Sequence, residues 1–165
     1  MSPVAAFHTA LGTLALATGA AVLLRPKGGR WHRVTGRVYV GSMVTLCLAS
    51  FALRDSTPFF HGLGPFHVAA VVSLVTVSAG GWAAWRRRED WLVAHYMWMA
   101  WSYIGLVMAT GGHVQAPLAT ALAEGGMARG AAIGIALGVV WGLPPLLGRR
   151  WIARAQPAWD ARAGA

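Results

Sequence analysis

The six histidines are the side chains of this chain with the clearest capacity for chemistry. Neutral imidazole is a common ligand of transition metals and of haem iron. The chain has one cysteine, Cys47, so it can form neither an internal disulfide nor a CxxC metal or redox motif. It also has no Ser–His–Asp arrangement, phosphate-binding loop or zinc-protease pattern. The sequence therefore specifies no reaction, and any cofactor site must be built from histidines.

Five long apolar segments must position these histidines. The chain is 56% hydrophobic and 12% charged, whereas soluble domains carry about 25% charged residues. A helix of about 20 residues crosses a hydrocarbon core of roughly 30 Å. We therefore predict an all-α integral membrane helical bundle with about five transmembrane helices, over Val4–Leu24, Val34–Leu53, Phe66–Trp85, Trp91–Gly111 and Ala128–Leu147.

The basic residues predict the orientation of this bundle. Twelve of the fourteen Lys and Arg residues lie in alternate gaps: 25–37, 86–88 and the tail after 148. Cytoplasmic segments of membrane proteins are enriched in Lys and Arg. We expect the N-terminus outside and the C-terminus in the cytoplasm. The connections Arg54–Pro65 and Gly112–Met127 would then lie outside.

The net charge of +9 does not indicate a nucleic-acid partner, because the basic residues do not form one continuous face. The expected partners are the lipid bilayer and the anionic lipids of its inner leaflet. Residues 1–150 form a single transmembrane helical domain. Residues 151–165 form a short basic cytoplasmic tail, either an interfacial stub or unstructured.

The last apolar segment carries a packing signal. Gly130, Gly134, Gly138 and Gly142 recur every four residues, and small residues at this spacing let two membrane helices approach closely. We expect the partner helix inside this chain, with a homodimer or another membrane protein as the alternative. Pro144 and Pro145 are expected to end or kink this helix.

The topology sorts the histidines into two levels. His8 and His67 lie at similar depth on the outer side, where they could be the two axial ligands of a haem b, and His113 or His61 could join them in a transition-metal site. His32 and His95 lie on the inner side, where they are also cofactor-ligand candidates. They form a weaker pair, because their estimated depths differ by roughly 10 Å at the helical rise. Each histidine also has a structural interpretation, a solvated loop or a hydrogen bond to a neighbouring helix.

One stretch resembles a known family. The sequence PKGGRWHRVTGRVY, from Pro26 to Tyr39, is similar to a KG…HR…GR-Y signature after the first span of small bacterial multi-pass membrane proteins of unknown function. That family also has a His and a Gly early in the first span, as His8 and Gly12 here, and a later His followed by Met and Ser-Tyr, as His95, Met97 and Ser102-Tyr103. This chain departs from the family at Tyr96, where Arg is frequent. The resemblance implies an inner-membrane helical bundle with recurring histidines and no known activity.

Two functions remain open. The first is a multi-pass membrane protein that binds haem or a metal through histidines, in membrane redox or its assembly. The alternative is a non-catalytic accessory or assembly subunit that packs through the glycine-striped helix. A transporter is disfavoured, because no inverted repeat or buried carboxylate is visible.

Overall fold

The computed structural model describes residues 2–53, 61 and 63–163, and the side chains of the last helix as far as Arg154. The described residues are helical, with no strand among them. The elements are α1 (Pro3–Leu24), α2 (Arg30–Ser50), α3 (Pro65–Arg86), α4 (Trp91–Glu124), α5 (Arg129–Leu137), a π-helical turn η1 (Gly138–Gly142) and α6 (Leu143–Ala163). The all-α prediction is confirmed. The connection expected at Arg54–Pro65 lies largely outside the described residues.

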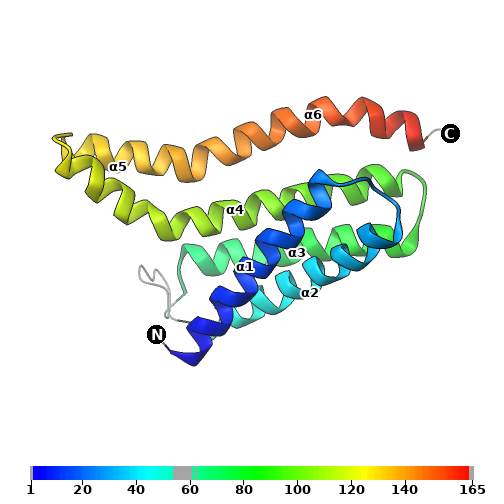
Figure 1. Cartoon of the computed structure of the whole chain (residues 1–165), viewed down its shortest axis with the longest axis horizontal. Coiled ribbons are helices and arrows are strands. Elements are labelled where there is room, and N and C mark those ends of the chain that lie inside the picture. The colour runs from blue at the N-terminus through cyan, green and yellow to red at the C-terminus, as the bar shows by residue number, and fades with distance from the viewer. Residues whose placement is uncertain (1, 54–60, 62, 164–165) are drawn as a thin grey trace.

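Helices α1 to α4 form an up-and-down bundle (Figure 1). Each helix contacts the next, and α1 also contacts α4, which closes the ring. Neighbouring helices are antiparallel, so α2 and α4 are parallel and face each other diagonally across the core. Bundles commonly place ligand and metal sites between side chains of such facing helices.

The segment α5–η1–α6 packs outside this ring. Its backbone lies against α4, and Figure 1 shows it running along that helix. The ring of Trp141 in η1 also reaches Phe66 of α3, with ring centroids 6.4 Å apart. One apolar contact between this segment and α4 is the buried Val140 of η1 against Gly111 of α4, where a Cβ would lie 3.0 Å from Val140 Cγ1. The indole Nε1 of Trp141 also donates a hydrogen bond to Gln115 Oε1 at 2.8 Å.

Four helical stretches of the described residues are long and apolar enough to cross a membrane: Pro3–Leu24, Pro65–Arg86, Trp91–Glu124 and Arg129–Arg154. Only 11–28% of the residues in the most apolar window of each stretch are buried inside the protein, as expected of helices with a lipid-facing side. Helix α2 is not among the four, although it lies between α1 and α3 and has similar length. Its basic first two turns and its polar core residues lower its mean hydropathy.

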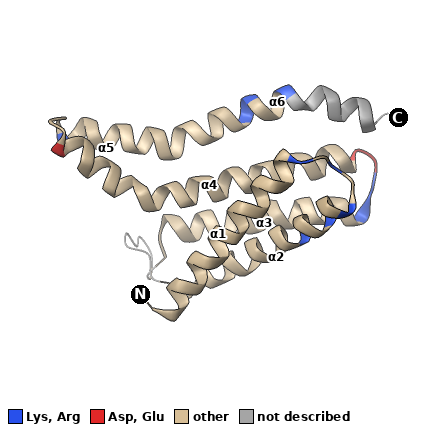
Figure 2. Cartoon of the chain, in the orientation of Figure 1, with Lys and Arg blue, Asp and Glu red and all other residues tan. Residues whose placement is uncertain are grey.

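The basic residues gather at one end of the bundle. Figure 2 shows the α1–α2 and α3–α4 connections at the same end, with the basic residues of α6 along the neighbouring edge. Lys27 in the first connection also caps α1, because its Nζ donates to the carbonyls of Val22 and Leu23, both at 2.6 Å, and of Arg25 at 3.0 Å. The burial of this side chain lowers the pKa of Lys27.

The expected connection at Gly112–Met127 is wrong, because α4 continues to Glu124 through Pro117. Gly111 and Gly112 resemble turn residues in the sequence, yet they allow close helix packing. A Cβ on Gly112 would lie 2.8 Å from the ring of Phe66, just as one on Gly111 would press on Val140. A proline within a membrane helix is tolerated where neighbouring helices compensate for the lost backbone bond.

The expected helix end at Pro144–Pro145 is also wrong. The amide of Leu143 bonds to the carbonyl of Gly138, five residues earlier, which widens the turn before the proline pair. The prolines then occupy the first turn of α6, where a missing N–H is tolerated. The tail after Arg150 therefore begins as a continuation of a helix.

The glycine stripe does not face the rest of this chain. At Gly130, Gly134, Gly138 and Gly142 no described heavy atom outside the helix's own backbone and the adjacent residues lies within 4 Å of the position a Cβ would take. The inward-facing residues of this segment are Ala132, Ala136 and Val140. The expected internal partner is wrong, because the neighbouring face packs on α4 instead.

Candidate functional site

The histidines gather at the two ends of the four-helix bundle. His32 and His95 lie at the basic end, and His8, His67 and His113 line one cavity toward the other end. Between these sites lie the polar layer of Tyr39 and Ser102 and an apolar layer that includes Met43 and Leu106.

The structure brings His32 and His95 together, with ring centroids 6.4 Å apart and ring planes at 83°. The expectation that they differ in depth by roughly 10 Å is therefore wrong. That depth estimate applied the helical rise of about 1.5 Å per residue to the residues between Arg88 and His95, although the first of them belong to the connection before α4. His32 is the third residue of α2 and His95 is the fifth of α4, so the two lie close to the same level.

One register aligns α2 with α4. His32 and His95 are 63 positions apart, as are Tyr39 and Ser102, whose hydroxyl oxygens lie 2.8 Å apart. Ser102 donates its single proton to the carbonyl of Met99 at 2.8 Å, so Tyr39 must donate to Ser102. The two pairs are one heptad apart, which places both on the core-facing stripe of parallel helices.

The tautomer of His95 follows from its partner. Its Nδ1 lies 2.8 Å from the carbonyl oxygen of Gly80 on α3. A carbonyl only accepts, so Nδ1 carries the proton and Nε2 keeps a lone pair. Gly80 is needed for this approach, because a Cβ there would lie 2.6 Å from Met99 Sδ and 3.3 Å from the Met99 amide nitrogen. Metal-binding histidines are usually oriented by such a second hydrogen bond.

His32 has a buried Nδ1 with no hydrogen-bond partner among the described residues. It lies in the first turn of α2, before the expected span at Val34. Neutral imidazole is the metal-binding form of histidine.

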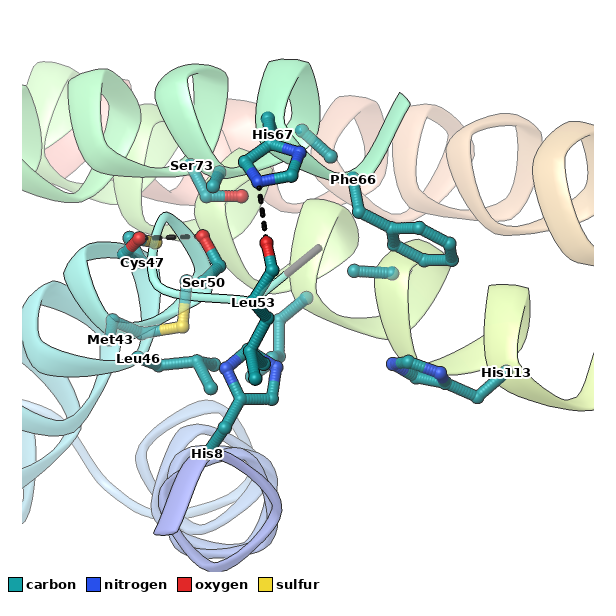
Figure 3. A pocket seen from close by; sticks show the side chains of 14 residues that line it. His8, Met43, Leu46, Cys47, Ser50, Leu53, Phe66, His67, Ser73 and His113 are labelled. Atoms are coloured by element: carbon teal, nitrogen blue, oxygen red, sulfur yellow. Dashed lines mark hydrogen bonds between the residues drawn. The ribbon is translucent and has the colours of Figure 1, made fainter. Parts of the chain in front are cut away.

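The second cluster surrounds a cavity of about 320 Å³. Figure 3 shows His8 of α1, His67 of α3 and His113 of α4 around it, with Met43 and Leu46 of α2 along one side. His8 Nδ1 is buried without a hydrogen-bond partner. His113 is exposed and stacks on Phe66, with ring centroids 5.1 Å apart and planes at 11°. His113 therefore belongs to a helix rather than to the expected loop.

His67 uses both ring nitrogens. Its Nδ1 accepts from the amide of Gly64 at 3.1 Å, and its Nε2 therefore donates to the carbonyl of Leu53, also at 3.1 Å. These bonds cap the start of α3 and hold it against the end of the α2 segment. Coordination of haem or a metal by His67 would require the loss of one of them. The His8–His67 axial pair is therefore less favoured by this geometry than the His32–His95 pair.

No group of three or more His, Cys, Asp or Glu side chains is placed to share a metal ion within the described ranges. The expected set of His8, His67 and His113 surrounds the cavity but is not gathered at one point. His61 lies in the α2–α3 connection with a positive φ of 43°, and it does not line this cavity. Cys47 is buried and lines the cavity, as expected for a small apolar side chain.

The comparisons with known proteins give a family. A family model described as "Predicted membrane protein (DUF2306)" matches residues 5–146. The chain belongs to this family. The match covers both histidine clusters and the glycine stripe, and it supports a membrane protein whose function is not known. No curated protein and no solved structure matches the chain.

Proposed function

We propose that this DUF2306 protein binds a redox-active metal centre between His32 and His95 and takes part in membrane electron transfer or its assembly. The observation that carries the proposal is the 6.4 Å separation of the two imidazole rings. Two imidazoles on opposite sides of one metal have ring centres about 6.3 Å apart, from metal–nitrogen bonds of about 2.0–2.1 Å and about 1.1 Å from nitrogen to ring centre.

The two imidazole nitrogens available at this site are suitable metal ligands. His95 offers Nε2 with its orientation fixed by Gly80, and His32 has a buried nitrogen that lacks a partner. Imidazole suits iron, copper and zinc. A copper or iron ion, alone or within haem b, would accept and release single electrons there. A single ion would require Nε2 of His95 and Nδ1 of His32 to face each other across the observed ring spacing, and a haem would require more room between these helices than a single ion.

We further propose that α2 is the fifth crossing, because it runs between the apolar helices α1 and α3 of the same ring. The basic end would then face the cytoplasm of a bacterium, where its arginines meet the anionic inner leaflet. This topology places the His32–His95 site near the inner surface. Reporter fusions at residues 28 and 165 should both report the cytoplasm, and a periplasmic signal from either would contradict it.

The metal proposal is tested with detergent-purified full-length protein from cells supplied with iron, copper and a haem precursor. Metal content and the absorption spectrum are measured for the natural chain, His32→Ala, His95→Ala and the control His61→Ala. We expect about one metal per chain, lost in the first two variants and kept in the control. A Soret band would identify haem, and its absence with bound copper or iron would identify a single ion. A folded, colourless and metal-free natural chain would overturn the proposal.

The second function, an accessory subunit that packs through the glycine face, is favoured by one observation. A Cβ added to any of the four glycines of α5 and η1 would meet no described atom from another part of the chain within 4 Å, so a partner's helix could approach that backbone. Co-purification of a membrane partner, or of a differently tagged second copy, should be lost in Gly134→Leu. An unchanged yield of the partner would remove this support.

A further inference from the structure

The cavity at the outer end of the bundle has features that the inner metal site does not explain. It is about 320 Å³ in volume and is bounded by α1, α2, α3 and α4. Pockets for small molecules are usually apolar, with a few polar groups that fix the ligand's orientation. Here Met43, Leu46 and Leu106 supply apolar walls, and His8, His67 and His113 supply imidazoles.

We propose that this cavity binds the headgroup of a membrane quinone or quinol. This ligand class is a flat ring with two oxygens that accept or donate hydrogen bonds, joined to an apolar tail. The cavity has a hydrogen-bonding side chain on one wall and flat aromatic rings on another. The proposal goes beyond the inner metal site and does not depend on it.

The polar contact would come from His8. Its Nδ1 is buried and has no hydrogen-bond partner in the part of the chain that the structure describes. Burial of such a group costs free energy unless a ligand completes its hydrogen bonding. An imidazole nitrogen can donate to a quinone carbonyl or accept from a quinol hydroxyl, depending on its tautomer. In Figure 3 the His8 ring points from α1 toward the space beside Leu46 and Leu53.

The flat wall would come from Phe66 and His113. Their rings are stacked within 11° of parallel, and Trp141 lies next to Phe66 at 6.4 Å between ring centroids. Offset stacking favours a further flat ring in this environment. His67 is held by Gly64 and Leu53, so it forms a rigid wall rather than the ligand-binding donor.

The location suits a ligand that arrives from lipid. Three of the four helices that bound the cavity, α1, α3 and α4, are long and apolar enough to span the membrane, and α1 exposes apolar side chains such as Phe7, which is 53% exposed. An apolar tail could therefore remain in the bilayer while the ring occupies the cavity.

The test uses the purified full-length chain in detergent, with decyl-ubiquinone and menadione as probes and oleate as a competitor. Bound probe is measured by equilibrium dialysis against matched empty micelles. Ala109→Phe fills the cavity, because Ala109 lines it. The control is Val72→Phe, which adds similar bulk on the exposed face of α3. His8→Leu removes the hydrogen-bonding group and keeps an apolar side chain of medium size.

We expect one probe per chain, no saturable binding in Ala109→Phe and unchanged binding in Val72→Phe. His8→Leu should weaken binding roughly 3- to 10-fold, the range for loss of one hydrogen bond. If Ala109→Phe unfolds, as judged by circular dichroism, Ala69→Leu replaces it, because Ala69 lines the same cavity. Probe retention equal to that of empty micelles would overturn the proposal.

Two further outcomes are decisive. Binding that oleate displaces and that His8→Leu leaves unchanged would mean that the cavity holds an acyl chain, which overturns the quinone assignment. The variants His32→Ala and His95→Ala separate the two proposals, because they should lose the metal and keep the probe. Loss of the probe in both variants while they remain folded would show that the cavity is not an independent site.

Discussion

Gly19→Ala tests the packing that holds α1 against the core between the two histidine clusters. A Cβ at Gly19 would fall on the ring of Tyr103 and would lie 2.9 Å from Cε2 of Tyr39. Tyr39 is 2% exposed and donates to Ser102, and Tyr103 donates to the carbonyl of Leu16 at 3.3 Å. Neither ring can move without disturbing its hydrogen bond. Overpacking of this kind costs about 1–3 kcal/mol.

The matched control is Gly41→Ala on α2, where nothing lies within 4 Å of the added Cβ. Both changes gain about 0.5–1 kcal/mol from removing glycine in a helix interior. This gain cancels in the comparison, so Gly19→Ala should have a free energy of unfolding about 1–3 kcal/mol below that of Gly41→Ala. The assay is reversible SDS-induced unfolding in mixed micelles, followed by far-ultraviolet circular dichroism.

A double-mutant cycle assigns the cause of that difference. Tyr103→Leu shortens the side chain that meets the added methyl group, so Gly19→Ala should cost much less in that background. Equal stability of Gly19→Ala and Gly41→Ala would refute the reasoning, because it would show that α1 does not pack against these tyrosines as described. An equal cost in both backgrounds would show that Tyr103 is not the obstacle.

The remaining predictions use the same protein. Tyr39→Phe should lower the free energy of unfolding by about 0.6 kcal/mol, the average for hydrogen bonds between membrane helices, and Ser102→Ala in that background should have little further effect in the same SDS titration. Metal bound at His32 should be released as the pH falls, because ligation requires neutral imidazole and protons compete with the metal for its nitrogen; dialysis followed by metal analysis measures this, and a metal content that does not fall on acidification would contradict it. Gly134→Leu should leave the unfolding free energy of the monomer within about 0.5 kcal/mol of the natural chain, because the site faces no residue; a larger loss would mean that an internal partner exists.

Most of the helical architecture could be predicted from apolar segment length and from basic gaps. The starts of α3 and α4 fall within a residue of the expected spans. The errors occur at glycine and proline residues, because both residue types are found in turns and also within packed membrane helices. Gly111 and Gly112 have the composition of a turn, and only the positions of Val140 and Phe66 show that they permit close packing. Pro144 is compatible with a continuous helix only because the preceding turn is widened.

The candidate sites could be predicted less well, because histidine pairing depends on helix register. The outer grouping of His8, His67 and His113 followed from depth along the spans, and the structure places all three around one cavity. Hydrogen bonding within that group could not be predicted, since the bonds of His67 depend on where Leu53 lies after α2. Pairing of His32 with His95 could be predicted only by knowing that residues 63 positions apart face each other across α2 and α4. The hydrogen bond between Tyr39 and Ser102 shows this register most clearly.

The polar character of α2 links its membrane placement to the proposed chemistry. Helix α2 is not apolar enough to be counted among the four candidate membrane spans. The residues that reduce its mean hydropathy include His32, Tyr39 and Ser42, and the last two are buried. The core-facing side of a helix can carry such groups, because neighbouring helices rather than lipid satisfy them: Ser102 accepts from Tyr39. The other buried polar side chains that the structure describes are His67, Ser73 and Thr76 on α3 and Ser102 on α4. We infer that α2, α3 and α4 share the polar core of this bundle, and that a search for functional residues should include α2 even though it is not among the four apolar stretches.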